Sequence, residues 1–184
     1  MVELLLAMAG TGFVAVAISS MLFSVSYGTT SNKDLRKIIV REKITAARVT
    51  AAIRESNRVL ATGDGFIVLW VNDDDADGQP KLSELRRIER VAVTSSILSY
   101  RSPASIAPAD DTVFDLATSD FEGETDAVKG TADFPAERWA TDVSNWTISI
   151  NNPTAQLATL VSFRLTLQGN GTEDISIFVA TLRN

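Results

Sequence analysis

The N-terminal segment constrains the fold of this chain more than any other part of its sequence. No residue in the range 4–32 is charged, and 4–23 is almost continuously apolar. About 20 apolar residues in a helix can cross a bilayer core of roughly 30 Å. A signal peptide would carry basic residues before its apolar run, and a buried core helix seldom needs so long an uncharged segment. We therefore expect residues 1–27 to form a transmembrane helix.

Charge is distributed unevenly along the 184 residues. Residues 1–60 hold 8 Lys and Arg against 4 Asp and Glu, whereas residues 61–184 hold 9 against 19. A basic N-terminal part therefore precedes an acidic body, and the net charge of −6 gives no reason to expect nucleic acid as a partner. The chain has no Cys and no His, so thiolate and imidazole catalysis, structural zinc and disulfides are all excluded. We expect no enzymatic activity, and any bound metal should prefer oxygen ligands.

The segment MVELLLAMAGTGFVAVAISSMLFSV resembles the N-terminal methylation segment of type IV pilins and of type II secretion pseudopilins. In that family a prepilin peptidase removes a short leader, and a conserved glutamate neutralises the N-terminal amine of a neighbouring subunit during assembly. The resemblance implies that Glu3 is this assembly residue. It also implies that the family's leader and first two mature residues would precede Met1. Lys33, Arg36 and Lys37 follow the apolar run, and the positive-inside rule alone would keep the C-terminal part in the cytoplasm; the family places it outside, which we expect here.

The remaining sequence predicts an amphipathic helix followed by strands. Apolar residues recur near helical spacing from Lys33 to Leu60, so we expect residues 28–62 to continue the N-terminal helix. Residues 63–184 should form an antiparallel β domain with a long loop at 102–142. The fold class we predict is α+β: a long N-terminal helix, half in the membrane and half amphipathic, packed on antiparallel sheets as in the ladle-shaped pilins. The expected strands are 66–72, 84–93, 96–101, 146–151, 160–168 and 174–183.

An acidic loop lies between the first two expected strands. Its spacing fits the calcium-loop pattern D-x-[DN]-x-[DN]-G-x5-E, in which carboxylates and a backbone carbonyl surround Ca²⁺. Pro80 and Lys81 do not suit a calcium loop, and the alternative is a solvated acidic turn that keeps the sheet edge from pairing. The predicted calcium ligands are Asp73, Asp75, Asp77, Gln79 through its carbonyl, and Glu84, which we expect to bind bidentately.

The order of these elements resembles the J-type minor pseudopilins. We therefore expect a structural subunit of a pilus-like fibre, in the first place a minor pseudopilin of a type II secretion system. The resemblance implies a single-pass inner-membrane protein with a periplasmic or extracellular C-terminal domain. Its partners would be other pilin or pseudopilin subunits, bound through the N-terminal helix, and a prepilin peptidase. The alternatives are a type IV pilin of an adhesion, motility or DNA-uptake pilus, and a standalone membrane-tethered calcium-binding module.

Overall fold

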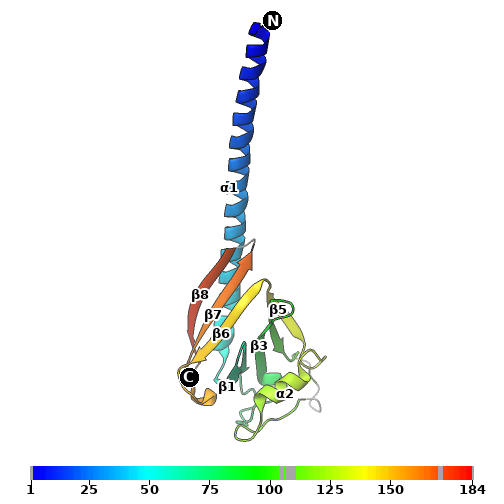
Figure 1. Ribbon diagram of the computed structural model, residues 1–184. Coiled ribbons are helices and arrows are strands. Elements are labelled where there is room, and N and C mark those ends of the chain that lie inside the picture. The colour runs from blue at the N-terminus through cyan, green and yellow to red at the C-terminus, as the bar shows by residue number, and fades with distance from the viewer. Residues whose placement is uncertain (1, 104–105, 107–110, 170–171, 184) are drawn as a thin grey trace.

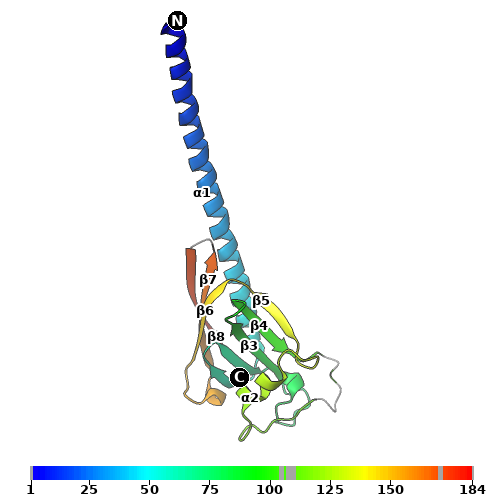
Figure 2. The ribbon, with the colours of Figure 1, turned by 45° about the vertical axis from the view of Figure 1, so that its right-hand side comes forward.

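A single long helix projects from a body built of two antiparallel sheets (Figure 1). The computed structural model describes residues 2–103, 106, 111–169 and 172–183, and within the first helix it describes the side chains of 16, 18–23 and all residues from Arg36 onward. This helix, α1, spans Val2–Glu55 and would be about 80 Å long at 1.5 Å per residue. Only its C-terminal part lies against the body, and its N-terminal part extends away from it in both views (Figures 1 and 2).

The packed part of α1 buries one face. Ile38, Ala46, Val49 and Ile53 are all buried, and their spacing of three to four residues or its multiples places them along one side of the helix. The helix ends where Ser56 donates its hydroxyl to the carbonyl of Ala52, and the backbone then joins the first strand. Charged side chains such as Arg36, Lys43 and Arg54 occupy the solvent face.

The body contains a five-stranded and a three-stranded sheet, both antiparallel. The first has the order β1-β2-β3-β4-β5 and is a meander, in which each strand pairs with the next along the chain. The second has the order β6-β7-β8, so β8 forms one of its edges. The strands are β1 Arg58–Gly63, β2 Phe66–Trp70, β3 Leu85–Val91, β4 Ser96–Arg101, β5 Ala136–Ala140, β6 Val143–Ile150, β7 Leu160–Gly169 and β8 Thr172–Thr181.

Two apolar clusters hold these layers together. The larger lies between α1 and the two sheets, and its largest fully buried side chains include Trp146, Phe163 and Ile53. The smaller lies on the other side of the five-stranded sheet, where Phe121 and Phe134 pack against strand residues such as Val68. Phe121 begins α2, which spans Phe121–Val128, so the predicted loop 102–142 contains both a helix and the strand β5. Single-turn helices occur at Leu82–Glu84 (η1) and Ala155–Leu157 (η2).

The transmembrane helix expected over residues 1–27 is not supported by the structure. Within the part of the chain that the structure describes, no helix is both long enough and apolar enough to cross a bilayer. Eight charged residues lie between Arg36 and Glu55, in the part of α1 that packs against the body. A span needs about 20 consecutive apolar residues. The transmembrane helix at 1–27, and with it the single-pass anchoring in the inner membrane, is therefore wrong by this criterion.

The α+β fold class is corrected as well. The body is mostly β-sheet, and its own helices, α2, η1 and η2, are short. The predicted continuation of the helix over 28–62 is too long, because α1 ends at Glu55 and Arg58 already begins β1. Val59 and Leu60 are buried as strand residues of β1.

Candidate metal site

The acidic loop connects two neighbouring strands of the five-stranded sheet. Trp70, the last residue of β2, lies opposite Leu85, the first residue of β3. The pairing continues one step into the loop, where the amide of Val71 donates to the carbonyl of Glu84 at 2.9 Å. The two ends of the loop are therefore held together, and residues distant in sequence, such as Asp73 and Glu84, become neighbours.

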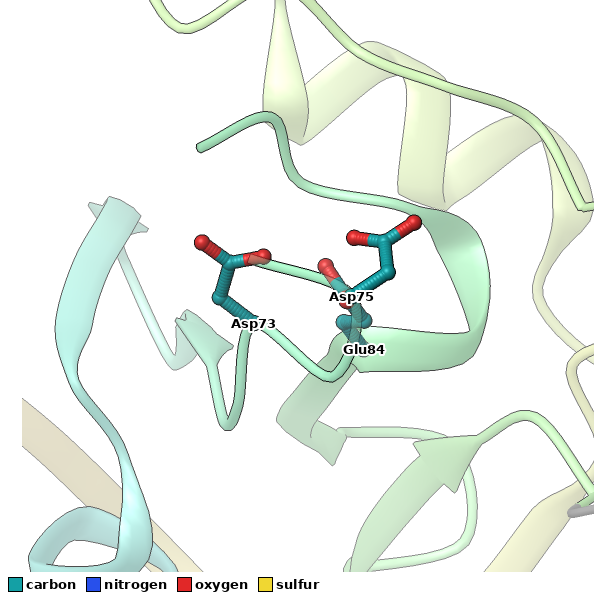
Figure 3. Close-up of side chains that lie close together, drawn as sticks. All are labelled: Asp73, Asp75 and Glu84. Atoms are coloured by element: carbon teal, nitrogen blue, oxygen red, sulfur yellow. The ribbon is translucent and has the colours of Figure 1, made fainter. Parts of the chain in front are cut away.

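Three carboxylates gather at this point. Asp73, Asp75 and Glu84 each contribute one oxygen, and these oxygens lie within 4.8 Å of one another. Figure 3 shows the three side chains beside one another between β2 and β3. Such a group could bind a metal ion, because a cation relieves the repulsion among neighbouring carboxylates.

The loop backbone holds the aspartates in place. Ala76 and Gly78 have positive φ values of 57° and 75°, so the chain reverses sharply here. The reversal lets the amide of Gly78 donate to Oδ2 of Asp73 at 3.1 Å, and the amide of Gln79 donate to Oδ1 of Asp77 at 2.8 Å. The loop is thus ordered by its own side chains.

One oxygen of Asp73 has no partner. Its Oδ1 is shielded from solvent and accepts no hydrogen bond, although Oδ2 of the same carboxylate is bonded to Gly78. A buried carboxylate oxygen without a donor is unfavourable, since water has been removed and nothing replaces it. A cation at this position would satisfy it.

Glu84 is the most buried member of the group, with 4% of its surface exposed. Its Oε2 accepts hydrogen bonds from the indole Nε1 of Trp70 at 3.0 Å and from the amide of Lys81 at 3.1 Å. Its Oε1 accepts one from the amide of Asp74 at 2.8 Å. Because each carboxylate oxygen has about two acceptor positions, only Oε1 has capacity left. Glu84 therefore suits monodentate ligation, in contrast to the bidentate binding expected of it.

Lys81 provides a cation within the loop itself. Its ammonium group forms ion pairs with Asp75 and Asp77. The hydrogen bond from Lys81 lowers the pKa of Asp75 below its usual value, and the hydrogen bonds to Asp75 and then Asp77 raise the pKa of Lys81. Asp75 therefore belongs both to the ion pair with Lys81 and to the set of three carboxylates, Asp73, Asp75 and Glu84. Lys81 would consequently compete with a metal ion for Asp75.

The predicted ligands thus divide into two sets. Asp73, Asp75 and Glu84 lie together, whereas Asp77 pairs with Lys81 and is not part of the group found among the described residues. Ligation by the backbone carbonyl of Gln79 stays a prediction. The side chain of Glu3, the predicted assembly residue, is outside what the structure describes.

A second charged group, which we call the β3–α2 cluster, was missed at the sequence level. It joins the sheet to α2 through Arg87, Glu89, Tyr100, Asp126 and Lys129. Arg87 donates to Oε2 of Glu89 at 2.8 Å and to Oδ1 of Asp126 at 3.0 Å. Burial raises the pKa of Tyr100 to about 12, helped by Glu89, whose Oε1 accepts its hydroxyl at 3.1 Å.

The sequence did contain a signal for this cluster. Arg87 and Glu89 are two residues apart in the expected strand, so they must share one face of the sheet. Both are buried, at 4% and 7% exposed. Arg87 also donates to Thr125 Oγ1 and to the carbonyl of Glu122, both at 3.0 Å, and it lies 4.7 Å from the ring centre of Phe66. Its donors are therefore used internally, and the cluster fastens α2 to the sheet.

The comparisons with known proteins assign no family to this chain. No family model, no curated protein and no solved structure matches it. Its function must therefore be inferred from its own residues, chiefly the carboxylate group in the β2–β3 loop and the exposed apolar residues of α1.

Proposed function

We propose that this chain is a structural subunit of a pilus-like fibre that assembles through α1. The observation that carries the proposal is the exposure of large apolar side chains on the projecting part of that helix. Val16, Ile18, Met21, Leu22 and Phe23 are between 55% and 79% exposed. Exposed apolar groups on this scale mark a surface that another molecule covers.

The directions of these side chains indicate more than one neighbour. At 100° per residue, positions 16, 18, 21, 22 and 23 cover about 220° of the helix circumference. A helix that is apolar over so wide a face is stable when that face is covered on more than one side. A bundle of α1 helices from several copies of the chain would cover these side chains. Such a bundle, repeated along an axis, is the core of a fibre.

The resemblance of the N-terminal segment to pilins and pseudopilins supports the same assembly. In this proposal Glu3 neutralises the amine of a neighbouring subunit within the bundle. Replacement by alanine, Glu3→Ala, should then reduce incorporation into fibres. A minor role in a secretion fibre and a role in a type IV pilus are both compatible with the helix.

The direct test is assembly of the full chain, observed by negative-stain electron microscopy and sedimentation. We expect fibres from the unchanged chain and their loss in Phe23→Lys, because a lysine in the bundle would bury an unpaired charge. Val93→Lys is the matched control, since Val93 is 96% exposed in the turn between β3 and β4. A chain that stays monomeric at every concentration, or fibres unaffected by Phe23→Lys, would contradict the proposal.

We also propose that the metal of the β2–β3 loop is Ca²⁺. The ligands are carboxylate oxygens, and the chain has no Cys or His to favour a softer metal. Three protein carboxylates leave several of the six to eight positions around Ca²⁺ to water or backbone oxygens. The site should accordingly be weak, with a Kd of roughly 10⁻⁴ to 10⁻³ M. Bound calcium would hold the connection between β2 and β3 in the fibre.

Titration calorimetry of the full chain tests this assignment. Calcium should bind saturably, and Asp73→Asn should abolish binding, because the amide removes the charge yet can still accept the bond from Gly78. Asp64→Asn, an identical change at an exposed residue between β1 and β2, should leave binding unaffected. Equal heats from both variants, or no heat at millimolar calcium, would show that the loop is only an acidic turn.

A further inference from the structure

The edge strand β8 carries an exposed apolar row. Ile175, Ile177 and Val179 are 48%, 71% and 54% exposed, while the residues between them face α1 and are more buried. Glu173, also exposed, precedes them on the same side of the strand. We call these four residues the β8 row. Its pattern is one acidic group followed by three β-branched apolar groups.

A groove of about 470 Å³ lies on the other side of α1. Figures 1 and 2 both show α1 between β8 and β5, and the groove lies where α1 meets β5. Val40 and Ile44 are 56% and 50% exposed there, and Trp139 of β5 forms the opposite wall. The other lining residues are all basic. We call this surface the α1–β5 groove, and it is lined by Arg36, Lys37, Val40, Arg41, Ile44 and Trp139.

The two surfaces are complementary in charge. The β8 row begins with the carboxylate of Glu173, and the α1–β5 groove begins with the cations Arg36 and Lys37. Each then continues with apolar side chains. Complementary charge at the end of an apolar contact fixes its register and orientation.

The two surfaces also lie at the same level along α1. Near the start of β8, Gly169 lies so close to Ile38 that a Cβ on it would approach Ile38 Cδ1 to 2.8 Å. Past the end of β8, the amide of Arg183 donates to the carbonyl of Ser56 at 3.0 Å. The β8 row therefore runs in the same direction as α1, with Glu173 near the level of residues 36–40. Two copies side by side with parallel helices would bring acid to base and apolar to apolar.

We infer that the β8 row of one copy docks in the α1–β5 groove of the next copy. The inference rests on the proposed fibre function and deepens it, because it names the contact between neighbouring bodies. A contact between two different surfaces of one protein is heterologous, so it can repeat without limit and build a helical filament. The alternative, in which two β8 edges pair with each other, would give a closed dimer with antiparallel helices.

Cysteine cross-linking of the full chain separates these arrangements, because the natural sequence contains no Cys. Ile177→Cys and Ile44→Cys are mixed, one of them with a tag that gives the mixed dimer its own mobility, and then oxidised under assembly conditions. A disulfide forms only when the two Cα atoms come within about 7 Å. We expect mixed dimers of Ile177→Cys with Ile44→Cys, and few from Ile177→Cys mixed with Val93→Cys as the control.

Electron microscopy of the same samples distinguishes failure of the inference from failure of the proposed function. Fibres with the mixed dimer support both. Fibres without it, or with dimers only between two Ile177→Cys chains, overturn the docking contact and leave the fibre function standing. A mixed dimer without fibres supports the contact and overturns the fibre function, and the absence of both overturns both.

A charge exchange tests the register. Glu173→Lys or Arg36→Glu alone should lower the yield of the mixed dimer about tenfold, since each places like charges opposite one another. When Glu173→Lys is placed on the copy that carries the β8 cysteine and Arg36→Glu on the copy that carries the groove cysteine, the yield should recover. No loss in the single changes, or no recovery in the exchanged pair, would contradict the proposed register.

Discussion

Two charged groups, the β3–α2 cluster and the acidic β2–β3 loop, lie on or next to β3. They differ in whether their charged side chains find hydrogen-bond partners within the protein. In the β3–α2 cluster, both oxygens of Glu89 accept hydrogen bonds, and Arg87 donates to four different residues. In the β2–β3 loop, by contrast, Asp73 Oδ1 is buried and accepts no hydrogen bond. Both groups contain carboxylates and a lysine, so composition alone does not separate them. The unpaired oxygen identifies the loop as the one with room for a ligand.

The difference follows from where each group lies. Arg87 and Glu89 are in the middle of a strand and covered by α2, so each must find a partner within the protein. The aspartates of the loop lie where β2 and β3 have stopped pairing, and water or an ion can reach some of them. A closed network contributes stability and fixes α2 on the sheet, whereas an open one could bind a metal ion.

Removal of Arg87 should cause the largest effect on stability. Arg87→Leu leaves the buried carboxylate of Glu89 without its main partner, which costs about 3–5 kcal/mol in comparable buried pairs. Urea unfolding of the full chain measures the loss. Arg164→Leu, at an exposed position on β7, should change the free energy of unfolding by no more than about 0.5 kcal/mol.

The double variant Arg87→Leu/Glu89→Leu sharpens this test. It removes both charges of the pair, so it should be less destabilised than Arg87→Leu alone. Two results would contradict internal pairing of these charges. One is a loss of less than about 1 kcal/mol in the free energy of unfolding for Arg87→Leu, and the other is a loss in the double variant equal to the sum of the losses in Arg87→Leu and Glu89→Leu.

Stability at high pH should depend on Tyr100. Its pKa is raised from the usual 10.0 to about 12, so the folded state favours the protonated hydroxyl. The resulting stabilisation is fully present below pH 10 and is lost as the pH rises through about 12. Unfolding by urea between pH 9 and 12 should therefore show a steeper fall for the unchanged chain than for Tyr100→Phe. Parallel curves for the two chains would show that Tyr100 does not titrate as a member of the cluster.

Several elements follow from the sequence because local signals determine them. The expected strands 96–101 and 160–168 correspond closely to β4 and β7, since turn residues bound each of them and apolar residues alternate in β7. The calcium-loop spacing also predicted that Asp73, Asp75 and Glu84 would lie together. In the structure the pairing of β2 with β3 brings the two ends of this loop together.

Other features depend on contacts that the sequence does not display. Val59 and Leu60 fit the helical spacing of the sequence before them. In the structure, however, the amide of Asn57 donates a hydrogen bond to the carbonyl of Trp70, and residues 58–63 pair with β2 as the strand β1. α2 lies in a polar stretch, and contacts with the sheet hold it there: Phe121 is buried with Phe134, and Arg87 donates hydrogen bonds to residues of α2. The expectation of bidentate binding by Glu84 overlooked the indole of Trp70, which reaches it through tertiary packing.

Each charged group contains one lysine, Lys81 in the β2–β3 loop and Lys129 in the β3–α2 cluster, so replacing each lysine compares the two groups. The ammonium of Lys81 pairs with Asp75 and Asp77, so it neutralises part of the negative charge that would attract calcium. Lys81→Met should therefore tighten calcium binding by about tenfold, because one competing positive charge is removed from the ligand group. Calorimetry gives the Kd. Lys129 of the β3–α2 cluster pairs with Asp126 and Glu89. Lys129→Met should leave the Kd for calcium unchanged. If both variants bind calcium like the unchanged chain, Lys81 does not compete with the metal. If Lys81→Met binds more weakly, the lysine instead holds Asp75 in the position that the metal requires.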